Sequence, residues 1–181
     1  MNSGKSTALL QIAYNYFERS QKAIIVKPVT DTKAFSHIQS RLGSEKDVDI
    51  LLKTDESLLE RIKQISDVDC VLIDEAQFLT VSQVDDAFEI AVICNIPVIA
   101  YGLRGDFQTR SFSGSLRLLE ISHSIEELKT ISRCGKKAIF NGRLINGKFV
   151  KSGNQVAIDG QQAEYESLCG ICYITKVGSV R

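Results

Sequence analysis

The chain opens with MNSGKST (residues 1–7), and the triplet Gly4-Lys5-Ser6 within it is the downstream half of a phosphate-binding loop. In such a loop, backbone N–H groups surround the phosphates of a nucleotide, the lysine reaches the β- and γ-phosphate oxygens, and the serine hydroxyl holds Mg²⁺. A complete loop also has an upstream glycine and a preceding buried strand, and the sequence has neither before Ser3. We therefore expect a nucleotide site at the start of a helix, and a first strand that is missing from this sequence.

A second motif lies where the apolar run Val71-Leu72-Ile73 is followed directly by Asp74-Glu75. A carboxylate at the carboxyl end of a buried strand, beside a phosphate-binding loop, commonly holds Mg²⁺ directly or through water. Gly-Lys-Ser alone is a common triplet that also occurs by chance at helix starts. The two motifs in this order predict a nucleotide-binding protein of the P-loop class.

Apolar periodicity between and after these motifs alternates between helical and strand patterns. The expected elements are helix 5–19, strand 23–26, helix 57–66, strand 70–73, helix 82–95 and strand 97–101, with a polar loop over 28–47. Short, wholly apolar strands that alternate with helices are typical of a parallel sheet covered on both faces. The predicted fold is α/β, with a RecA-like parallel sheet and flanking helices. Cys70 and Cys94 fall within apolar patterns and are expected in the core.

The pattern changes after Thr130. Residues 136–150 have the signature of a β-hairpin, in which Asn146-Gly147 suits a tight turn. The remaining residues contain several glycines and no long amphipathic helix. We predict two domains, an α/β nucleotide-binding domain over 1–130 and a small β-rich lobe over 131–181.

Composition narrows the class of protein. The 181 residues are 44% hydrophobic and 24% charged, and acidic and basic residues balance at 22 each. There is thus no net field to attract nucleic acid or an anionic membrane, and no apolar run long enough to span a bilayer. Five cysteines is an odd number, which argues against a secreted disulfide framework. We expect a cytoplasmic protein with no nucleic-acid or membrane partner.

Glu75 raises the question of the reaction. An acid directly after the Mg²⁺-associated aspartate can polarise an attacking oxygen, either a water in an ATPase or a hydroxyl in a kinase. Local chemistry does not separate these two alternatives.

At this point the chain resembles the cellular-type thymidine kinases, which have a P-loop α/β domain and a small zinc-ribbon-like lobe with a lasso loop. The stretches that carry the resemblance are MNSGKST (1–7), KP and DT (27–28, 31–32), DEAQF (74–78), YGLRGDF (101–107), ELKT (127–130), CG (134–135) and Tyr165 with Cys169 and Cys172. The resemblance implies transfer of the γ-phosphoryl group of ATP to the 5′-hydroxyl of thymidine, with deoxyuridine also accepted.

The resemblance also implies roles for individual residues. Glu75 would be the base that takes the 5′-hydroxyl proton, and Arg143 matches a family arginine, a candidate phosphate or site residue. The residues that would bind ATP and Mg²⁺ are Ser3, Gly4, Lys5, Ser6, Thr7 and Asp74. The residues that would bind thymidine are Met1, Leu103, Phe107, Ile158, Gly160 and Tyr165, with Phe107 stacked on the base and the lasso closing over it.

Two further expectations come from the resemblance. Zn²⁺ would be held by Cys134, Cys169 and Cys172, but a second Cys-x-x-Cys pair is incomplete because Ile131 stands at its first position, so the ligand set lacks a fourth member. The family is usually tetrameric, and helix 82–95 is one candidate interface. Two alternatives to the kinase stay open, a P-loop ATPase and an N-terminally truncated nucleotide-binding form with little turnover.

Overall fold

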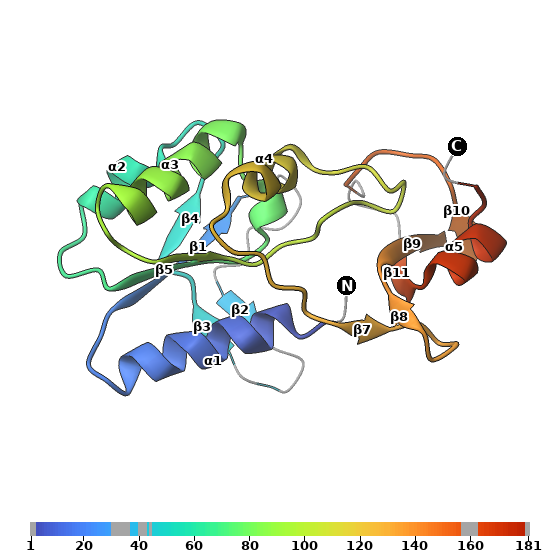
Figure 1. Cartoon of the computed structure of the whole chain (residues 1–181), viewed down its shortest axis with the longest axis horizontal. Helices are drawn as coiled ribbons and strands as arrows, with labels where there is room; N and C mark the ends of the chain where they lie inside the picture. Colours follow the sequence, from blue (N-terminus) through green and yellow to red (C-terminus); the bar gives the residue numbers. More distant parts are fainter. Residues whose placement is uncertain (1–2, 30–36, 40–42, 44, 157–162, 180–181) are drawn as a thin grey trace. The chain divides into compact units, whose positions relative to one another are not determined.

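The computed structural model describes residues 3–29, 37–39, 43, 45–156 and 163–179 (Figure 1). The described residues fall into two compact units. The larger unit contains residues 4–102 and 113–125, and the smaller unit contains residue 3, residues 103–112 and the chain from 126 on. The domain boundary predicted at residue 130 stays a prediction, and each unit is described by itself.

A four-stranded parallel sheet forms the centre of the larger unit. Its strand order is β4-β1-β5-β6, and every neighbouring pair is parallel. The bounds are β1 Ala23–Pro28, β4 Ile50–Leu52, β5 Cys70–Ile73 and β6 Val98–Ala100. All four residues of β5 are buried, which agrees with an unbroken apolar run in a sheet covered on both faces. The predicted α/β fold with a parallel sheet is confirmed; β4 was not predicted.

Helices pack on both faces of this sheet (Figure 1). They are α1 Lys5–Phe17, α2 Leu58–Lys63, α3 Val81–Val92 and α4 Ser113–Ile121, with the 3₁₀ helix η1 Ala76–Phe78. Alternate residues of β1 enter two separate cores: Ile25 packs with Leu9 of α1, and Ile24 packs with residues of α2 and α3. Among the described residues, no helix is both long enough and apolar enough to cross a membrane.

Two expectations about the larger unit were wrong in detail. Cys94 is exposed rather than buried, because α3 ends at Val92 and Cys94 lies beyond it, whereas Cys70 is buried as expected. Within the predicted loop 28–47, the described residues include a short antiparallel pair, β2 His37–Gln39 with β3 Glu45–Asp47.

The smaller unit is built from antiparallel strands and one short helix. Its three-stranded sheet has the order β10-β9-β11, and a second pair joins β7 to β8. The bounds are β7 Thr130–Ile131, β8 Lys137–Ala138, β9 Phe140–Ile145, β10 Lys148–Val150, β11 Ala163–Leu168 and α5 Gly170–Lys176. Asn146 and Gly147 both have positive φ, 49° and 73°, as a two-residue type I′ turn requires. The predicted hairpin is therefore confirmed.

Candidate functional site

The first turn of α1 has the geometry of an anion site. Gly4 precedes the helix in a left-handed conformation, with φ of 77°, and its carbonyl accepts the Ala8 N–H at 2.9 Å. Its backbone needs the freedom that glycine provides. No acidic side chain lies in the first turn, which contains Ser6 and Thr7. A first helical turn leaves its N–H groups without partners inside the helix, and these groups and the positive end of the helix dipole suit an anion at this point.

Asp74 lies directly after β5 and is almost completely buried, at 4% exposure. Its backbone N–H donates to the Val26 carbonyl at 2.9 Å, which fixes it at the end of the sheet. Burial, and next the negative charge of Glu75, raise the pKa of Asp74, while the backbone N–H of Glu75, and then Lys27 and Lys5, act in the opposite direction. The structure thus brings Lys5 of the first motif close enough to Asp74 of the second for their charges to interact.

The Oδ1 atom of Asp74 has no hydrogen-bond partner among the described residues. A buried carboxylate oxygen without a donor is costly, and a cation or its bound water would satisfy it. The chemistry of this donor, beside a lysine at a helix start, therefore fits a magnesium–nucleotide site.

Glu75 is held in a strained backbone conformation. Its φ of 51° and ψ of 39° lie in the left-handed region, which is uncommon for residues other than glycine. The Gln77 amide donates to the Glu75 carboxylate at 2.5 Å. The next residue, Ala76, donates its N–H to the Tyr101 carbonyl at 2.9 Å and so ties this turn to the end of β6. Strain that the surroundings enforce in this way is typical of functional positions.

Two residues near these carboxylates were not predicted as site residues. Lys27 acts on Asp74 from β1, and Gln77, only 2% exposed, orients Glu75. Both residues lie within stretches that carry the family resemblance, and that resemblance could have marked them as candidates. Their interactions with Asp74 and Glu75 become visible only in the three-dimensional structure.

The smaller unit holds Phe107 in a tightly bonded loop. The Asp106 carboxylate accepts the backbone N–H groups of Gln108 and Arg110 at 2.8 and 2.9 Å, which shapes the loop around the ring. The Tyr173 hydroxyl donates to the Phe107 carbonyl at 2.7 Å. Phe107 itself is 1% exposed, so its ring lies within the packed interior of this unit.

Arg143 joins Phe107 to two other segments. Its guanidinium carbon lies 3.7 Å from the Phe107 ring centroid, and its Nε donates to the Tyr165 hydroxyl at 2.9 Å. Its two terminal nitrogens donate to the carbonyls of Asn154 and Gln155 at 2.7 and 2.8 Å. Arg143 is 4% exposed. Its donors are thus directed at oxygens of the protein.

The remaining predicted nucleoside residues are only partly covered by the structure. Leu103 is half-buried at the start of the Phe107 loop, and Ser3 is half-buried before Gly4. Met1, Ile158 and Gly160 lie outside the described residues.

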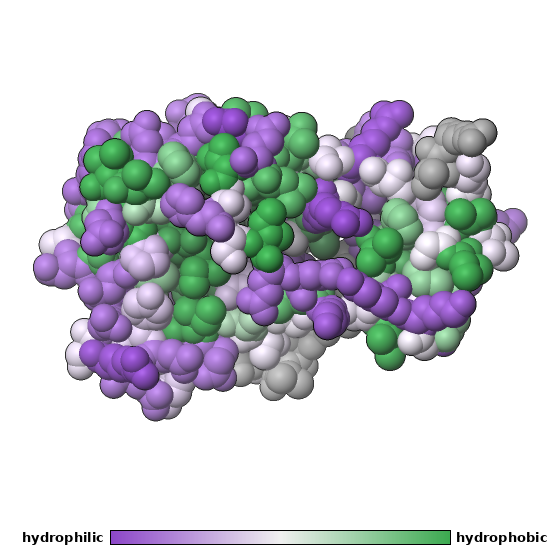
Figure 2. Space-filling view, in the orientation of Figure 1, coloured by the Kyte–Doolittle hydropathy of each residue, from purple (hydrophilic) through white to green (hydrophobic). Residues whose placement is uncertain are grey.

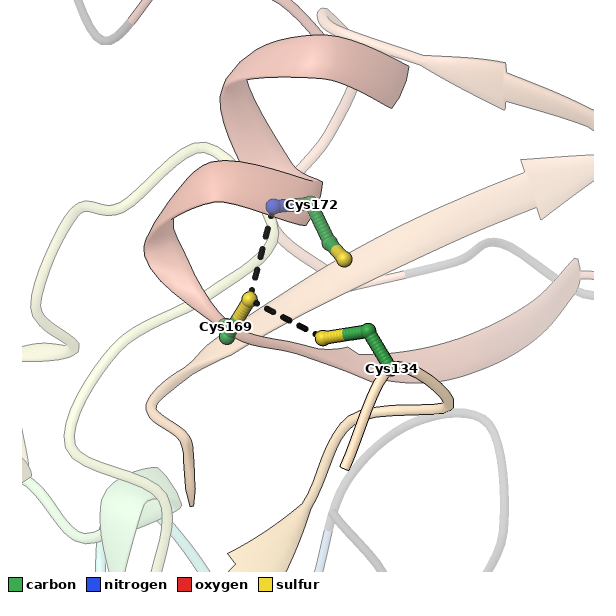
Figure 3. Close-up of side chains that lie close together, drawn as sticks. All are labelled: Cys134, Cys169 and Cys172. Atoms are coloured by element: carbon green, nitrogen blue, oxygen red, sulfur yellow. Dashed lines mark hydrogen bonds between the residues drawn. The ribbon is translucent and has the colours of Figure 1, made fainter. Parts of the chain in front are cut away.

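Three cysteines form a compact cluster in the smaller unit (Figure 3). The sulfur atoms of Cys134, Cys169 and Cys172 all lie within 4.8 Å of one another, and the first two are 3.5 Å apart. Cys169 caps α5 by accepting the Cys172 N–H at 3.5 Å, and Cys134 lies in the turn between β7 and β8. The backbone N–H of Lys136, and then the neighbouring thiols, lower the pKa of Cys134 to about 6. Three converging sulfurs, one an easily formed thiolate, fit a zinc ion.

The fold and these groups define an α/β protein in which the groups at one end of a parallel sheet fit nucleotide binding, with a separate β unit that contains a thiol cluster. The family profile for thymidine kinase matches residues 1–173. The chain is 42% identical to the thymidine kinase of Mannheimia succiniciproducens over 99% of this chain and 94% of the relative. It is 44% identical to that of Colwellia psychrerythraea (93% and 90%) and 42% to that of Enterobacteria phage T4 (93% and 89%). This chain belongs to the thymidine kinase family.

Proposed function

We propose that this protein transfers the γ-phosphoryl group of ATP to the 5′-hydroxyl of thymidine, giving TMP and ADP, and that it also accepts deoxyuridine. The observation that carries the proposal is the Asp74-Glu75 pair, a buried, unsatisfied carboxylate followed by a strained, oriented one. Membership of the thymidine kinase family supports the hydroxyl of a nucleoside, rather than water, as the acceptor. The family relationship thereby favours the kinase over an ATPase or a nucleotide-binding form with little turnover.

The larger unit supplies the groups for phosphoryl transfer in this proposal. Gly4, Lys5, Ser6 and Thr7, with Ser3 before them, hold the phosphates of ATP through backbone N–H groups and the lysine ammonium. Mg²⁺ bound with ATP would neutralise charge on the phosphates, and the Ser6 hydroxyl and the Asp74 carboxylate would hold it directly or through water. Glu75 accepts the proton of the 5′-hydroxyl as that oxygen attacks the γ-phosphorus.

The smaller unit supplies nucleoside recognition. Phe107 and Leu103 have their proposed roles beside the thymine ring from the family resemblance, and Arg143 packs on the Phe107 ring. Arg143 is then a positioning residue rather than a phosphate ligand, because it fixes Phe107, Tyr165 and the carbonyls at 154–155 together. The family resemblance supports three further contacts with the base, from Met1, Ile158 and Gly160.

The direct test is phosphoryl transfer by the full chain with ATP, Mg²⁺ and thymidine, with TMP and ADP both measured. Glu75→Gln should lower TMP formation by about 10²- to 10⁴-fold, since it removes the base but keeps the shape. Glu89→Gln, an exposed acid on α3, is the matched control and should leave the rate unchanged. Rapid ATP hydrolysis that ignores thymidine and forms no TMP would establish the ATPase alternative instead.

Nucleoside positioning has its own test. Arg143→Lys keeps the positive charge but loses the planar fork that reaches two carbonyls and the Tyr165 hydroxyl. We expect a higher KM for thymidine and an unchanged KM for ATP. An equal rise in both KM values would mean that the substitution loosens the whole protein rather than the nucleoside site.

We further propose a cytoplasmic homotetramer. Exposed apolar side chains on α3 and α4 support self-association: they are Val81, Phe88, Val92, Leu116 and Leu119. Figure 2 shows hydrophobic residues among hydrophilic ones on the face of the larger unit that carries these helices. Light scattering after size-exclusion chromatography should give four times the chain mass, and Phe88→Glu should lower it.

We also propose that Cys134, Cys169 and Cys172 bind a structural Zn²⁺ in the smaller unit. The compact donor set supports this assignment.

A further inference from the structure

Ser132 has a buried hydroxyl that forms no hydrogen bond with the described residues. The residue is 2% exposed, and its Oγ has no hydrogen-bond partner among the described residues. Its backbone is fully used: the N–H donates to the Lys136 carbonyl at 2.8 Å, and the carbonyl accepts the Gly135 N–H at 2.9 Å. These two bonds close the turn that carries Cys134. Buried hydroxyls are nearly always paired, so this one calls for an explanation.

The hydroxyl lies beside two thiols of the cysteine cluster. Its side chain interacts with the thiol of Cys172 and with that of Cys134. Ser132 is thus close enough to act on both sulfurs, yet it completes a well-formed hydrogen bond with neither.

The cluster lacks one ligand for a closed zinc site. Structural Zn²⁺ is almost always four-coordinate and tetrahedral, and the group of potential ligands among the described residues consists of three cysteines. Ile131, at the position where a second Cys-x-x-Cys pair would begin, is 70% exposed and apolar. Ser132, the next residue of the same turn, offers a hydroxyl oxygen as a ligand instead.

We propose that Ser132 Oγ is the fourth ligand of a Zn²⁺ held by Cys134, Cys169 and Cys172. The site is then a three-sulfur, one-oxygen centre rather than a four-sulfur one. A neutral hydroxyl is a weaker ligand for zinc than a thiolate, so the centre should bind Zn²⁺ less tightly than the same site with four cysteines. This inference concerns metal binding alone, and it stands or falls independently of phosphoryl transfer.

The test compares Zn²⁺ affinity of the full-length protein by competition with a chromophoric chelator. Removing the metal-binding oxygen in Ser132→Ala should weaken affinity by about tenfold or more, whereas Ser132→Cys should strengthen it by a similar factor. Ser167→Ala, which alters another buried serine of the same unit, is the matched control and should leave affinity unchanged. X-ray absorption of the wild type should give three sulfurs at about 2.3 Å and one oxygen at about 2.0 Å.

A second measurement keeps the proposal testable if Ser132→Ala does not fold. With Co²⁺ in place of Zn²⁺, thiolate-to-metal charge-transfer absorption scales with the number of bound thiolates. It should rise by about one third from wild type to Ser132→Cys, as three sulfurs become four in a tetrahedral centre. The proposal is overturned if the wild type binds no Zn²⁺, if Ser132→Ala keeps wild-type affinity, or if Ser132→Cys adds no charge-transfer intensity.

Discussion

At the scale of single residues, Glu75 combines a chemical role with a backbone cost. Its left-handed conformation is enforced by the bond from Ala76 to Tyr101 on one side, while the Gln77 amide holds its carboxylate. Such a conformation costs on the order of 1–3 kcal/mol in a residue that has a Cβ, but little in glycine. A glutamate at this strained position is explained if its carboxylate is needed for the proposed reaction.

We therefore expect Glu75→Gly to lower the activity and to raise the stability of the protein. Phosphorylation of thymidine should fall by about 10²- to 10⁴-fold, because the variant lacks the proposed base. The free energy of unfolding should rise by about 1 kcal/mol, measured by urea denaturation, since glycine relieves the strain. Glu75→Gln is the control: it should lose activity to the same extent without the gain in stability. A glycine variant no more stable than the glutamine variant would refute stored strain at this residue.

Asp74 predicts a pH effect in the metal-free protein. Burial raises the pKa of Asp74 above its unfolded value, so the unfolded state releases this proton first as pH rises. Between the unfolded pKa, about 4, and the higher folded pKa, the folded state therefore holds more protons and stability falls with rising pH. Asp74→Asn removes this contribution. It should be more stable than wild type at neutral pH without Mg²⁺, while losing phosphoryl transfer; equal slopes of unfolding free energy against pH would contradict the assignment.

The residues that could be predicted from sequence are those with a local signature. Asp74 and Glu75 come directly after an apolar strand, so their place at the end of the sheet follows from the pattern alone. Gln77 and Ser132 could not be identified in this way. Gln77 matters because it contacts Glu75, and Ser132 matters because it lies near Cys172. In the sequence alone, each is a polar residue in a turn, which is common without any functional role.

At the scale of elements, α4 supports the turn that carries Glu75 through an unusually close approach at Gly114. A Cβ placed on Gly114 would lie 2.6 Å from the Leu79 carbonyl oxygen and 2.9 Å from that of Ala76. Both oxygens belong to the backbone in and just after η1, so they cannot move aside as a flexible side chain would.

Gly114→Ala should therefore push α4 away from η1. We expect a loss of about 1–3 kcal/mol in unfolding free energy, as for other overpacked sites, together with lower kinase activity through displacement of η1. Gly170→Ala is the matched control in α5, because a Cβ there would meet Phe140 at an ordinary 3.7 Å. Calorimetry of the two variants checks this, and a Gly114→Ala protein as stable as the control would show that the contact is not tight.

Elements with strong local signals were predictable, and the others depend on tertiary packing. The strand Cys70–Ile73 matches the structure residue for residue, since an unbroken apolar run is a local signal. The helix expected over 57–66 forms as α2, and the Ser57 side chain caps it. By contrast, α4 begins Ser-Gly-Ser, a poor helical start, and forms where it packs on η1 and α3. Similarly, β4 has only three residues, and its parallel pairing with β1 defines it.

At the scale of the whole molecule, the two units are stabilised by different means. The larger unit has two apolar cores on either face of its sheet. Far fewer fully buried apolar side chains belong to the smaller unit, and its strands connect to α5 and the cysteine cluster. Small units with limited cores commonly depend on a metal or on cross-links. The composition and the switch from helical to hairpin patterns predicted a second, smaller part, and the family resemblance added the expectation of Zn²⁺ in it.

This difference predicts which part of the protein responds to metal removal. A strong chelator should remove the proposed Zn²⁺ from the cysteine cluster, and with it a connection between the β7–β8 turn and α5. Amide hydrogen exchange should then accelerate in β9, β11 and α5, while β1 and β5 of the larger unit keep their protection. Cys172→Ser should reproduce the effect without chelator, and Cys94→Ser, an exposed cysteine outside the cluster, should not. Equal acceleration in both units would show that they unfold as one, and no acceleration in either would show that the cluster does not stabilise the fold.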